Sequence, residues 1–306
     1  MRNAFADEIT SMALEDERIH LLSGDIGNRL FNNFQDKCPG RFFNCGVAEA
    51  NMISVGAGMC LSGLRAVAYT ITTFITSRCF EQIKLDVCYN GAPLIIVGVG
   101  AGLSYASLGP THHSFEDVAI LRSLPGMTVL APCDAFELRA ALRAAVALNK
   151  PVYIRIGKKG EPKIHSAIPE LTIGKAMKMR EGGDACLISS GPILFEALKA
   201  AEILAQAGIN VEVINMPTIK PLDTSALEEV VSRHKLVMTI EESSVIGGFG
   251  SAVADWAAES GAFARTRLMR AGIPDHFIHE AGEQEFAREL CGLTGKQIAQ
   301  RIQQAL

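Results

Sequence analysis

Long hydrophobic runs are missing from this sequence of 306 residues. The longest apolar runs, such as residues 93–99, are much shorter than the ~20 residues that a membrane span needs. The first residues, Met1 to Ala4, are soon followed by charged ones and lead into no apolar signal core. These absences argue against a membrane span and against secretion.

Long basic runs are missing as well. The net charge is −4, and no basic run exceeds the pair Lys158-Lys159. Proteins that bind nucleic acid or anionic membranes usually carry a basic patch or tail. Nucleic acid and membranes are therefore not expected as partners.

The cysteines lack the spacing of a metal or redox motif. No two of them form Cys-x-x-Cys, and no cysteine–histidine group has the spacing of a zinc site, so we expect no metal site in this chain. Most of them stand in apolar stretches, which predicts buried free thiols in a reducing cytoplasm. The eight are Cys38, Cys45, Cys60, Cys79, Cys88, Cys133, Cys186 and Cys291.

What the chain does have is an alternation of short apolar runs and longer helical patterns. This pattern predicts two doubly wound α/β domains with parallel sheets. The break at 158–169, rich in Pro, Gly and charge, predicts domain 1 at 1–160, a linker at 161–175 and domain 2 at 176–306. Strands are expected at 18–22, 66–70, 94–99, 128–131, 152–156, 185–189, 210–214 and 235–240. Helices are expected at 48–61, 77–89, 115–123, 135–148, 194–207, 250–258 and 295–304.

Two segments combine polar side chains with apolar surroundings. In 43–52, Glu49 opens a helix whose remainder is almost entirely apolar, and a carboxylate there needs a partner. Either it is a raised-pKa functional acid or it satisfies free N–H groups at the helix start. In 109–117, His112 and His113 stand in a loop before a helix, where α/β proteins place their sites. They could shuttle protons or serve only in turns and caps.

Two further segments also allow both a functional and a structural interpretation. Asp25, in 23–28 after the first strand, is either functional or a helix-capping turn residue. The Gly-rich turn 247–251 opens a helix and could hold a phosphate. It lacks the lysine of a P-loop, so close backbone packing is the stronger interpretation.

Seven motifs in order resemble the C-terminal half of transketolase over nearly the whole chain. They are GDIGN, FNCGVAEANM, TTFITSRCFEQI, GLSYASLGPTHHSFEDVAILRSLPGM, PVYIRIG, IEESSVIGGFGSAV and GIPDHF. The resemblance implies a pyrimidine-binding domain followed by a transketolase C-terminal domain. It also implies thiamine diphosphate as cofactor and transfer of a two-carbon ketol unit from a ketose to an aldose.

The same resemblance implies roles for individual residues. Glu49 matches the glutamate that hydrogen-bonds the aminopyrimidine ring, and Phe74 matches the aromatic that stacks on it. Asp25 and Ile26 match residues that approach the thiazolium across an interface. His112 matches a histidine that contacts substrate oxygens.

The resemblance also implies residues that contact the substrate. One of them matches the family pattern and two depart from it. Arg155 matches an arginine aimed at the substrate phosphate. Leu108 stands where many relatives have an aspartate that binds a donor hydroxyl, and Arg29 stands where a small hydroxylic residue is common. Together they predict an anionic, unusual ketose donor.

The family's Gly-Asp-Gly motif, which ties the diphosphate to Mg²⁺ or Ca²⁺, is absent. The resemblance therefore implies a split enzyme in which an N-terminal partner subunit holds the metal and diphosphate, assembled as a heterotetramer. Three alternatives remain: the beta subunit of a 2-oxo acid dehydrogenase, a deoxyxylulose-phosphate-synthase-like enzyme, and a non-catalytic paralogue.

Overall fold

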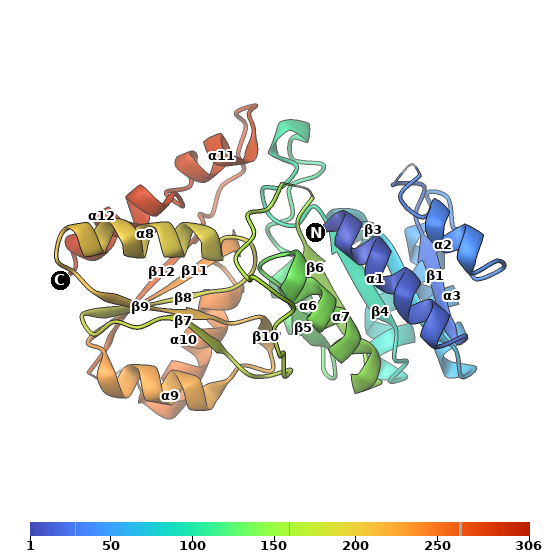
Figure 1. Cartoon of the computed structure of the whole chain (residues 1–306), viewed down its shortest axis with the longest axis horizontal. Coiled ribbons are helices and arrows are strands. Elements are labelled where there is room, and N and C mark those ends of the chain that lie inside the picture. Colours follow the sequence, from blue (N-terminus) through green and yellow to red (C-terminus); the bar gives the residue numbers. More distant parts are fainter. Residues whose placement is uncertain (28, 159, 263–264) are drawn as a thin grey trace.

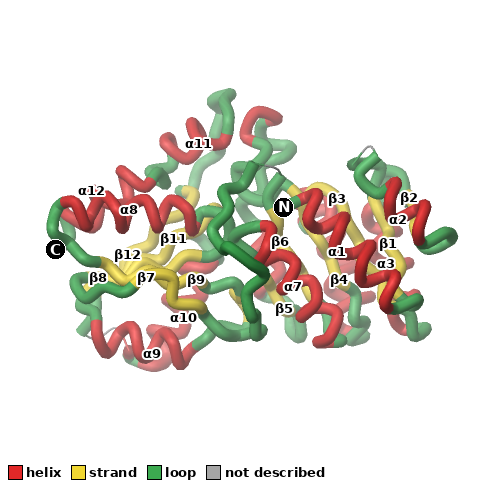
Figure 2. The backbone as a smooth tube through the Cα atoms, in the orientation of Figure 1, coloured by secondary structure: helices red, strands yellow, loops and turns green. Residues whose placement is uncertain are grey.

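Two parallel-dominated sheets stand side by side, each covered by helices on both faces (Figure 1). The computed structural model describes residues 1–306 except 28, 159 and 263–264. A loop between β6 and β7 passes over the boundary between the sheets (Figure 2). The predicted architecture of two doubly wound α/β domains is confirmed.

The first sheet has seven strands in the order β10-β5-β6-β4-β3-β1-β2. Six of them run parallel, and all of these except the edge strand β2 bury apolar side chains between the covering helices. Their bounds are β1 Ile19–Ser23, β2 Phe42–Asn44, β3 Arg65–Ile71, β4 Ile95–Val99, β5 Thr128–Leu130, β6 Val152–Ile156 and β10 Thr218–Lys220.

Helices cover both faces of this sheet. The side chain of Asp134 caps α7 by accepting hydrogen bonds from the backbone N–H groups of Phe136 and Glu137, each at 2.9 Å. The helices are α1 Arg2–Glu15, α2 Asn32–Lys37, α3 Glu49–Leu61, α4 Thr72–Ile75, η1 Ser77–Cys79, α5 Phe80–Gln82, η2 Ile83–Tyr89, η3 Ala106–Leu108, α6 Asp117–Arg122 and α7 Ala135–Leu148.

The second sheet has five strands in the order β12-β11-β8-β9-β7, with β7 antiparallel at one edge. Its strands are β7 Met177–Arg180, β8 Ala185–Ser189, β9 Val211–Asn215, β11 Leu236–Ser244 and β12 Arg267–Ile273. Its helices are α8 Leu194–Gln206, α9 Thr224–Arg233, α10 Phe249–Ser260, α11 Gln284–Leu290 and α12 Gly295–Gln303.

The sequence prediction omitted the strands β2, β7, β10 and β12 and the helices α1, α2, α9 and α11. The single helix expected at 77–89 is divided into η1, α5 and the π-helical η2. In addition, β10 lies beyond the linker in sequence but pairs antiparallel with β5, with Thr218 opposite Leu130. A three-residue edge strand carries too little periodicity to be predicted, and pairing protects the open edge of β5.

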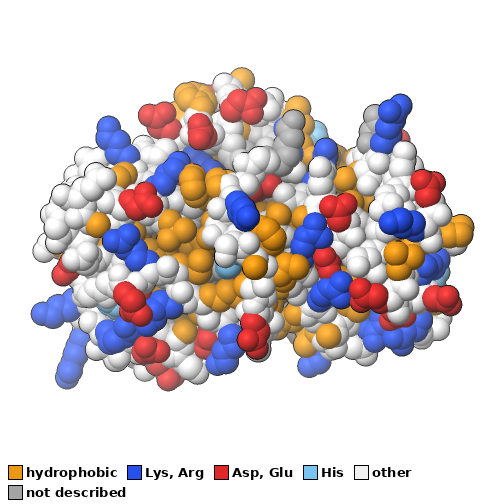
Figure 3. Space-filling view, in the orientation of Figure 1, with side chains coloured by type: hydrophobic (Ala, Val, Ile, Leu, Met, Phe, Trp, Pro, Cys, Tyr) orange, Lys and Arg blue, Asp and Glu red, His pale blue; other side chains and the backbone are white. Residues whose placement is uncertain are grey.

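The eight cysteines are all free. Five are buried, as predicted, and the three half-buried ones are Cys45, Cys88 and Cys291. Among the described residues, no helix is both long and apolar enough to span a bilayer. On the face shown in Figure 3, acidic and basic side chains are interspersed around apolar groups near the middle.

Arg155 on β6 lies in the joint between the two sheets. Its guanidinium donates to Asp117 Oδ2 at 2.7 Å and to the backbone oxygen of Glu242, on β11, at 2.7 Å. The residue is only 3% exposed. The guanidinium of Arg155 is therefore bound within the protein, and its contact with a substrate anion stays a prediction.

We predict that Asp117→Asn lowers the free energy of unfolding by about 3–5 kcal/mol, because Arg155 then stays buried without its anion. Urea unfolding of the purified chain measures this loss. As a control, Arg18→Met removes an exposed pair with Asp16 and should leave the urea midpoint near that of the wild type. Equal midpoints for all three proteins would contradict the structural role of the Arg155–Asp117 pair.

Candidate functional site

The residues predicted from sequence lie on segments that follow the carboxyl ends of neighbouring parallel strands. Asp25 and Ile26 follow β1, Glu49 follows β2, Phe74 follows β3 and His112 follows β4. In a parallel sheet these ends share one edge, which is where α/β folds place ligands. The fold thus gathers segments that are far apart in sequence.

Glu49 is buried at the first position of α3, where the free N–H groups of the helix favour a negative charge. Its Oε2 accepts a hydrogen bond from Arg78 Nη1 at 2.7 Å. The Arg78 side chain is half exposed, so this partner reaches the carboxylate from the solvent side. Arg78 is thus the partner that Glu49 was predicted to need, and a ligand can displace it.

Phe74 lies next to this pair. The guanidinium carbon of Arg78 is 4.6 Å from the centre of the Phe74 ring. Arg78 thus makes two contacts at once, a hydrogen bond to a carboxylate and a stack on an aromatic face. A flat, nitrogen-bearing aromatic ring could make the same two contacts in its place, which is what an aminopyrimidine requires.

His112 packs against two aromatic rings. Its ring centre lies 5.3 Å from that of Phe74 and 5.7 Å from that of Tyr105, both edge-on. Thr111 Oγ1 is 2.9 Å from His112 Nδ1. Partial burial, with the neighbouring His113 as a smaller cause, lowers the pKa of His112 below its usual value. The imidazole is therefore neutral at pH 7 and can donate or accept a proton.

His113 has a different setting from His112. It is buried, its Nε2 lies 3.3 Å from the backbone oxygen of Ala106, and its ring stacks on Phe115 at 5.2 Å. These contacts give His113 a structural role. Leu108, at the end of η3, is 52% exposed on the same loop.

Asp25, Ile26 and Arg29 line a separate cavity of about 510 Å³. Asn44 donates from Nδ2 to Asp25 Oδ1 at 3.0 Å and fixes the carboxylate. Arg29 is exposed and adopts a positive φ of 62°. Within the described residues, no hydrogen bond, ion pair or ring contact joins this group to Phe74 or His112. Asn28 of the GDIGN motif lies outside the described residues.

Sequence reasoning missed three contributors: Arg78, Tyr105 and Lys158. The Lys158 ammonium, just after β6, lies 4.7 Å from the centre of the Tyr105 ring, and Tyr105 contacts His112. A signal for Arg78 was available, because it stands four residues after Phe74 in a helical pattern. Nothing in the sequence marks the approach of Lys158 to Tyr105, which depends on the order of β4 and β6.

The Gly-rich turn at 247–251 is filled by the protein itself. Glu241 accepts hydrogen bonds from the backbone N–H of Phe249 at 2.6 Å and of Gly250 at 2.7 Å. A Cβ atom at Gly248 would clash with Glu241 Oε2. The packing interpretation is confirmed, and a buried carboxylate occupies the place that a phosphate would take.

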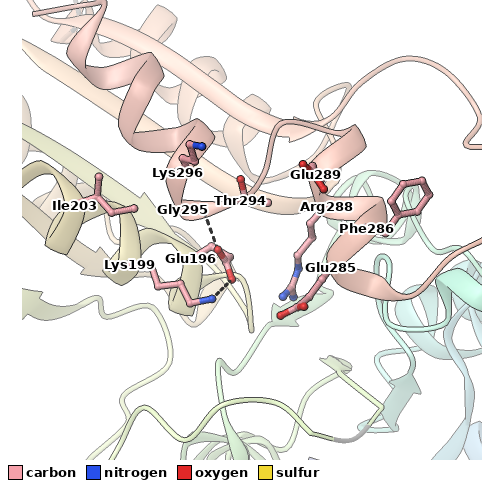
Figure 4. A pocket seen from close by; sticks show the side chains of 10 residues that line it. All are labelled: Glu196, Lys199, Ile203, Glu285, Phe286, Arg288, Glu289, Thr294, Gly295 and Lys296. Carbon is pink, nitrogen blue, oxygen red and sulfur yellow. Dashed lines mark hydrogen bonds and ion pairs between the residues drawn. The ribbon is translucent and has the colours of Figure 1, made fainter.

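A cavity of about 590 Å³ lies between α8, α11 and the start of α12 (Figure 4). Here Glu196 accepts a hydrogen bond from the backbone N–H of Gly295 at 2.7 Å and one from Lys199 Nζ at 3.0 Å. The start of α12 is therefore already satisfied by a carboxylate. None of the residues predicted from sequence lines this cavity.

Two family models match the chain. Residues 1–162 match the transketolase pyrimidine-binding domain, and residues 174–298 match the transketolase C-terminal domain. A solved structure described as a split gene transketolase, an inactive β4 tetramer, has 32% sequence identity and a TM-score of 0.89. That likeness covers 100% of this chain and 97% of the other.

Curated relatives of similar length are named as transketolase subunits. The chain is 40% identical to the 6-deoxy-6-sulfo-D-fructose transketolase subunit SqwH of Clostridium sp. (strain MSTE9), over 97% of this chain and 92% of the relative. It is 32% identical to a subunit of the apulose-4-phosphate transketolase of Phocaeicola vulgatus, over 94% and 91%. It also matches a 1-deoxy-D-xylulose-5-phosphate synthase of Chlorobium phaeovibrioides at 35% identity, but spans only 47% of that relative.

We predict that His112 titrates below the ordinary histidine pKa of about 6.5. The measurement is an NMR titration of the purified chain with labelled histidine, with His112→Asn used to assign the resonance. His113→Asn should move the midpoint part of the way back towards the ordinary value, because it removes the smaller of the two causes. A wild-type midpoint at or above the ordinary value would contradict the environment described for His112.

Proposed function

This chain belongs to the transketolase family, and from that premise we propose that it is the pyrimidine-binding subunit of a split, thiamine-diphosphate-dependent transketolase. The observation that carries the proposal is the placement of Glu49. It is a buried carboxylate at a helix start, with one exchangeable partner and an aromatic face beside it. The expected cytoplasmic location fits the eight free cysteines.

When bound, thiamine diphosphate supplies a nucleophilic carbon and an electron sink for breaking the bond next to a ketose carbonyl. Glu49 would hold the aminopyrimidine nitrogen and share a proton with it, and Phe74 would support the ring face. Because Arg78 now fills both contacts, the cofactor ring has to take its place on Glu49.

His112 would act on the substrate side of the same site. As a neutral imidazole it can donate a hydrogen bond to a substrate oxygen and accept a proton from a hydroxyl. Phe74 and Tyr105 hold its ring on both sides, so its position does not depend on the substrate. Asp25 and Ile26 remain candidates for contacts with the thiazolium half.

We assign the metal and diphosphate to a partner subunit. The supporting observation is that this chain lacks the Gly-Asp-Gly motif with which the family holds Mg²⁺ or Ca²⁺. A related chain is described as an inactive β4 tetramer, which supports both self-association and the need for a further chain. We therefore propose a heterotetramer in which the partner completes each site.

The donor is proposed to be an anionic ketose. Two relatives are named for a sulfo-sugar and a sugar phosphate, and both substrates carry an anionic group. Arg29, exposed in the cavity beside Asp25, is the proposed anion contact. The exposed Leu108 cannot bind a donor hydroxyl, so selection at that hydroxyl should be relaxed.

We predict that this chain transfers ketol units only after mixing with the diphosphate-binding subunit. In that mixture, Glu49→Gln should lower turnover by about 10²–10⁴-fold. An amide cannot share a proton with the pyrimidine nitrogen, and acid–base terms have this size. The measurement is steady-state turnover on ketose donors, with circular dichroism to show that the variant is folded.

The matched control is Glu81→Gln, at an exposed glutamate close to the site, which should retain wild-type turnover. Turnover by this chain alone would overturn the split arrangement. Production of deoxyxylulose phosphate from pyruvate in place of ketol transfer would favour the synthase alternative. If the chain assembles with the partner but no donor is turned over, the alternative of a non-catalytic paralogue is favoured.

A donor panel tests the substrate proposal separately. We predict that Arg29→Met raises KM for sulfonated and phosphorylated ketoses about tenfold or more, the size of a lost charge-assisted hydrogen bond, and leaves KM for neutral L-erythrulose unchanged. Lys37→Met, at an exposed lysine on the nearby α2, is the control. If xylulose 5-phosphate is the best donor by a wide margin and Leu108→Asp makes it a worse one, the donor proposal is wrong.

A further inference from the structure

Within the described residues, the fold brings together two groups of cysteine, glutamate and histidine side chains, although the sequence spacing indicated none. The joint triad consists of Cys133, Glu137 and His165, and the sheet triad consists of Cys186, Glu212 and His234. In each triad, one ligand-type atom from every residue lies within 4.8 Å of the others. Neither triad belongs to the site around Glu49.

The joint triad lies where three segments of the chain meet. Cys133 follows β5, Glu137 stands in the first turn of α7, and His165 belongs to the loop between β6 and β7. Asn215, at the end of β9 in the second sheet, donates to Glu137 Oε1 at 2.6 Å. Both domains and their connection therefore contact this one cluster.

The distances in the joint triad suit a tetrahedral metal site. Cys133 Sγ lies 3.7 Å from His165 Nδ1. Zinc–sulfur and zinc–nitrogen bonds of about 2.3 and 2.0 Å at a tetrahedral angle separate the two ligand atoms by about 3.5 Å. Cys133 and Glu137 are buried, and the His165 side chain is 12% exposed, which leaves one entry path.

The two triads differ in their surrounding charges. Glu212 of the sheet triad already pairs with His234 at 2.6 Å, Arg233 at 3.0 Å and Lys178 at 3.6 Å. The cations Arg233 and Lys178 compensate the carboxylate and would repel a further dication. The sheet triad is therefore complete as an ion-pair network.

The joint triad has no such compensation among the residues that the structure describes. Glu137 accepts only from an amide and from the backbone N–H of Cys133. Asp134 lies beside the triad, with Oδ2 3.4 Å from His165 Nδ1, but its two oxygens already accept four backbone N–H groups and it is not counted as a ligand. The nearby Lys163 turns away and places its ammonium over the Phe136 ring. A thiol, a carboxylate and one imidazole thus face each other without a lysine or arginine.

We propose that Cys133, Glu137 and His165 form a binding site for a divalent transition-metal ion, with zinc as the best match to the mixed sulfur, nitrogen and oxygen donors. Asn215 has a buried Oδ1 without a hydrogen-bond partner beside this site, and that oxygen is available to a water bound on the ion. The site has a structural role, because the ion would fasten the loop to α7 and, through Glu137 and Asn215, to the second sheet.

A bound ion would supply the positive charge that this cluster lacks, so binding should add stability to the fold.

The test is metal binding by the full, tag-free chain. Zinc is titrated into the metal-free protein against a chromophoric chelator, and melting temperatures are recorded with and without zinc. We expect about one equivalent bound per chain and a higher melting temperature with zinc. Cys133→Ser and His165→Ala should weaken binding at least about tenfold, as the loss of one ligand implies, and should abolish the thermal shift. Cys186→Ser in the sheet triad is the matched control and should bind as the wild type does.

Cobalt(II) gives a spectroscopic readout in the wild-type chain itself, so that readout does not require a variant to fold. In the wild-type chain it should give the intense near-ultraviolet band of a thiolate-bound ion, and Cys133→Ser should lack that band. Binding that survives Cys133→Ser and His165→Ala would show an adventitious ion only and overturn the proposal. Loss of binding in Cys186→Ser alone, or no binding at micromolar zinc, would also overturn it. None of these results bears on ketol transfer.

Discussion

The parallel direction of β1, β2, β3, β4 and β6 is the constraint on which the site depends. Because these strands leave the sheet at the same edge, the loops after them converge although their sequences are far apart. Glu49 on α3, Phe74 on α4 and His112 in a loop come from three segments, and contacts through Arg78 and the aromatic rings join them. A change that reversed or shifted one strand would separate these groups, so the sheet itself determines the chemistry at its edge.

Three buried carboxylates in this protein differ in the group that satisfies them. Asp117 is bound to an arginine that is itself buried, and that arginine also donates to the backbone oxygen of Glu242 in the second domain. Glu241 is satisfied by the first N–H groups of α10, and burial raises its pKa to about 7. Glu49 instead has a half-exposed arginine as its partner, which a ligand can displace. An exchangeable partner is what a cofactor-binding acid requires.

The sequence predicted most of the parallel strands because buried strands read as apolar runs between helical patterns. It also predicted that Glu49 needs a partner, since a carboxylate in an apolar helix is costly. It could not identify that partner, nor the contact between Lys158 and Tyr105, because both depend on strand order. Arg155 was assigned to a substrate because the resemblance to transketolase implied it, and a resemblance in sequence does not show whether a side chain faces a cleft or a domain joint. The joint triad could not be predicted from sequence either, because Cys133 and His165 come together only in the folded chain.

The central claim is that Glu49 shares a proton with the cofactor's pyrimidine ring and so activates it. The most direct measurement is hydrogen–deuterium exchange at the reactive thiazolium carbon of thiamine diphosphate, bound to the assembled enzyme without substrate. The account predicts fast exchange with the wild-type chain, exchange slowed by about 10²-fold or more with Glu49→Gln, and wild-type exchange with Glu81→Gln. Equal exchange rates for the wild type and Glu49→Gln, with cofactor bound in both, would contradict the account.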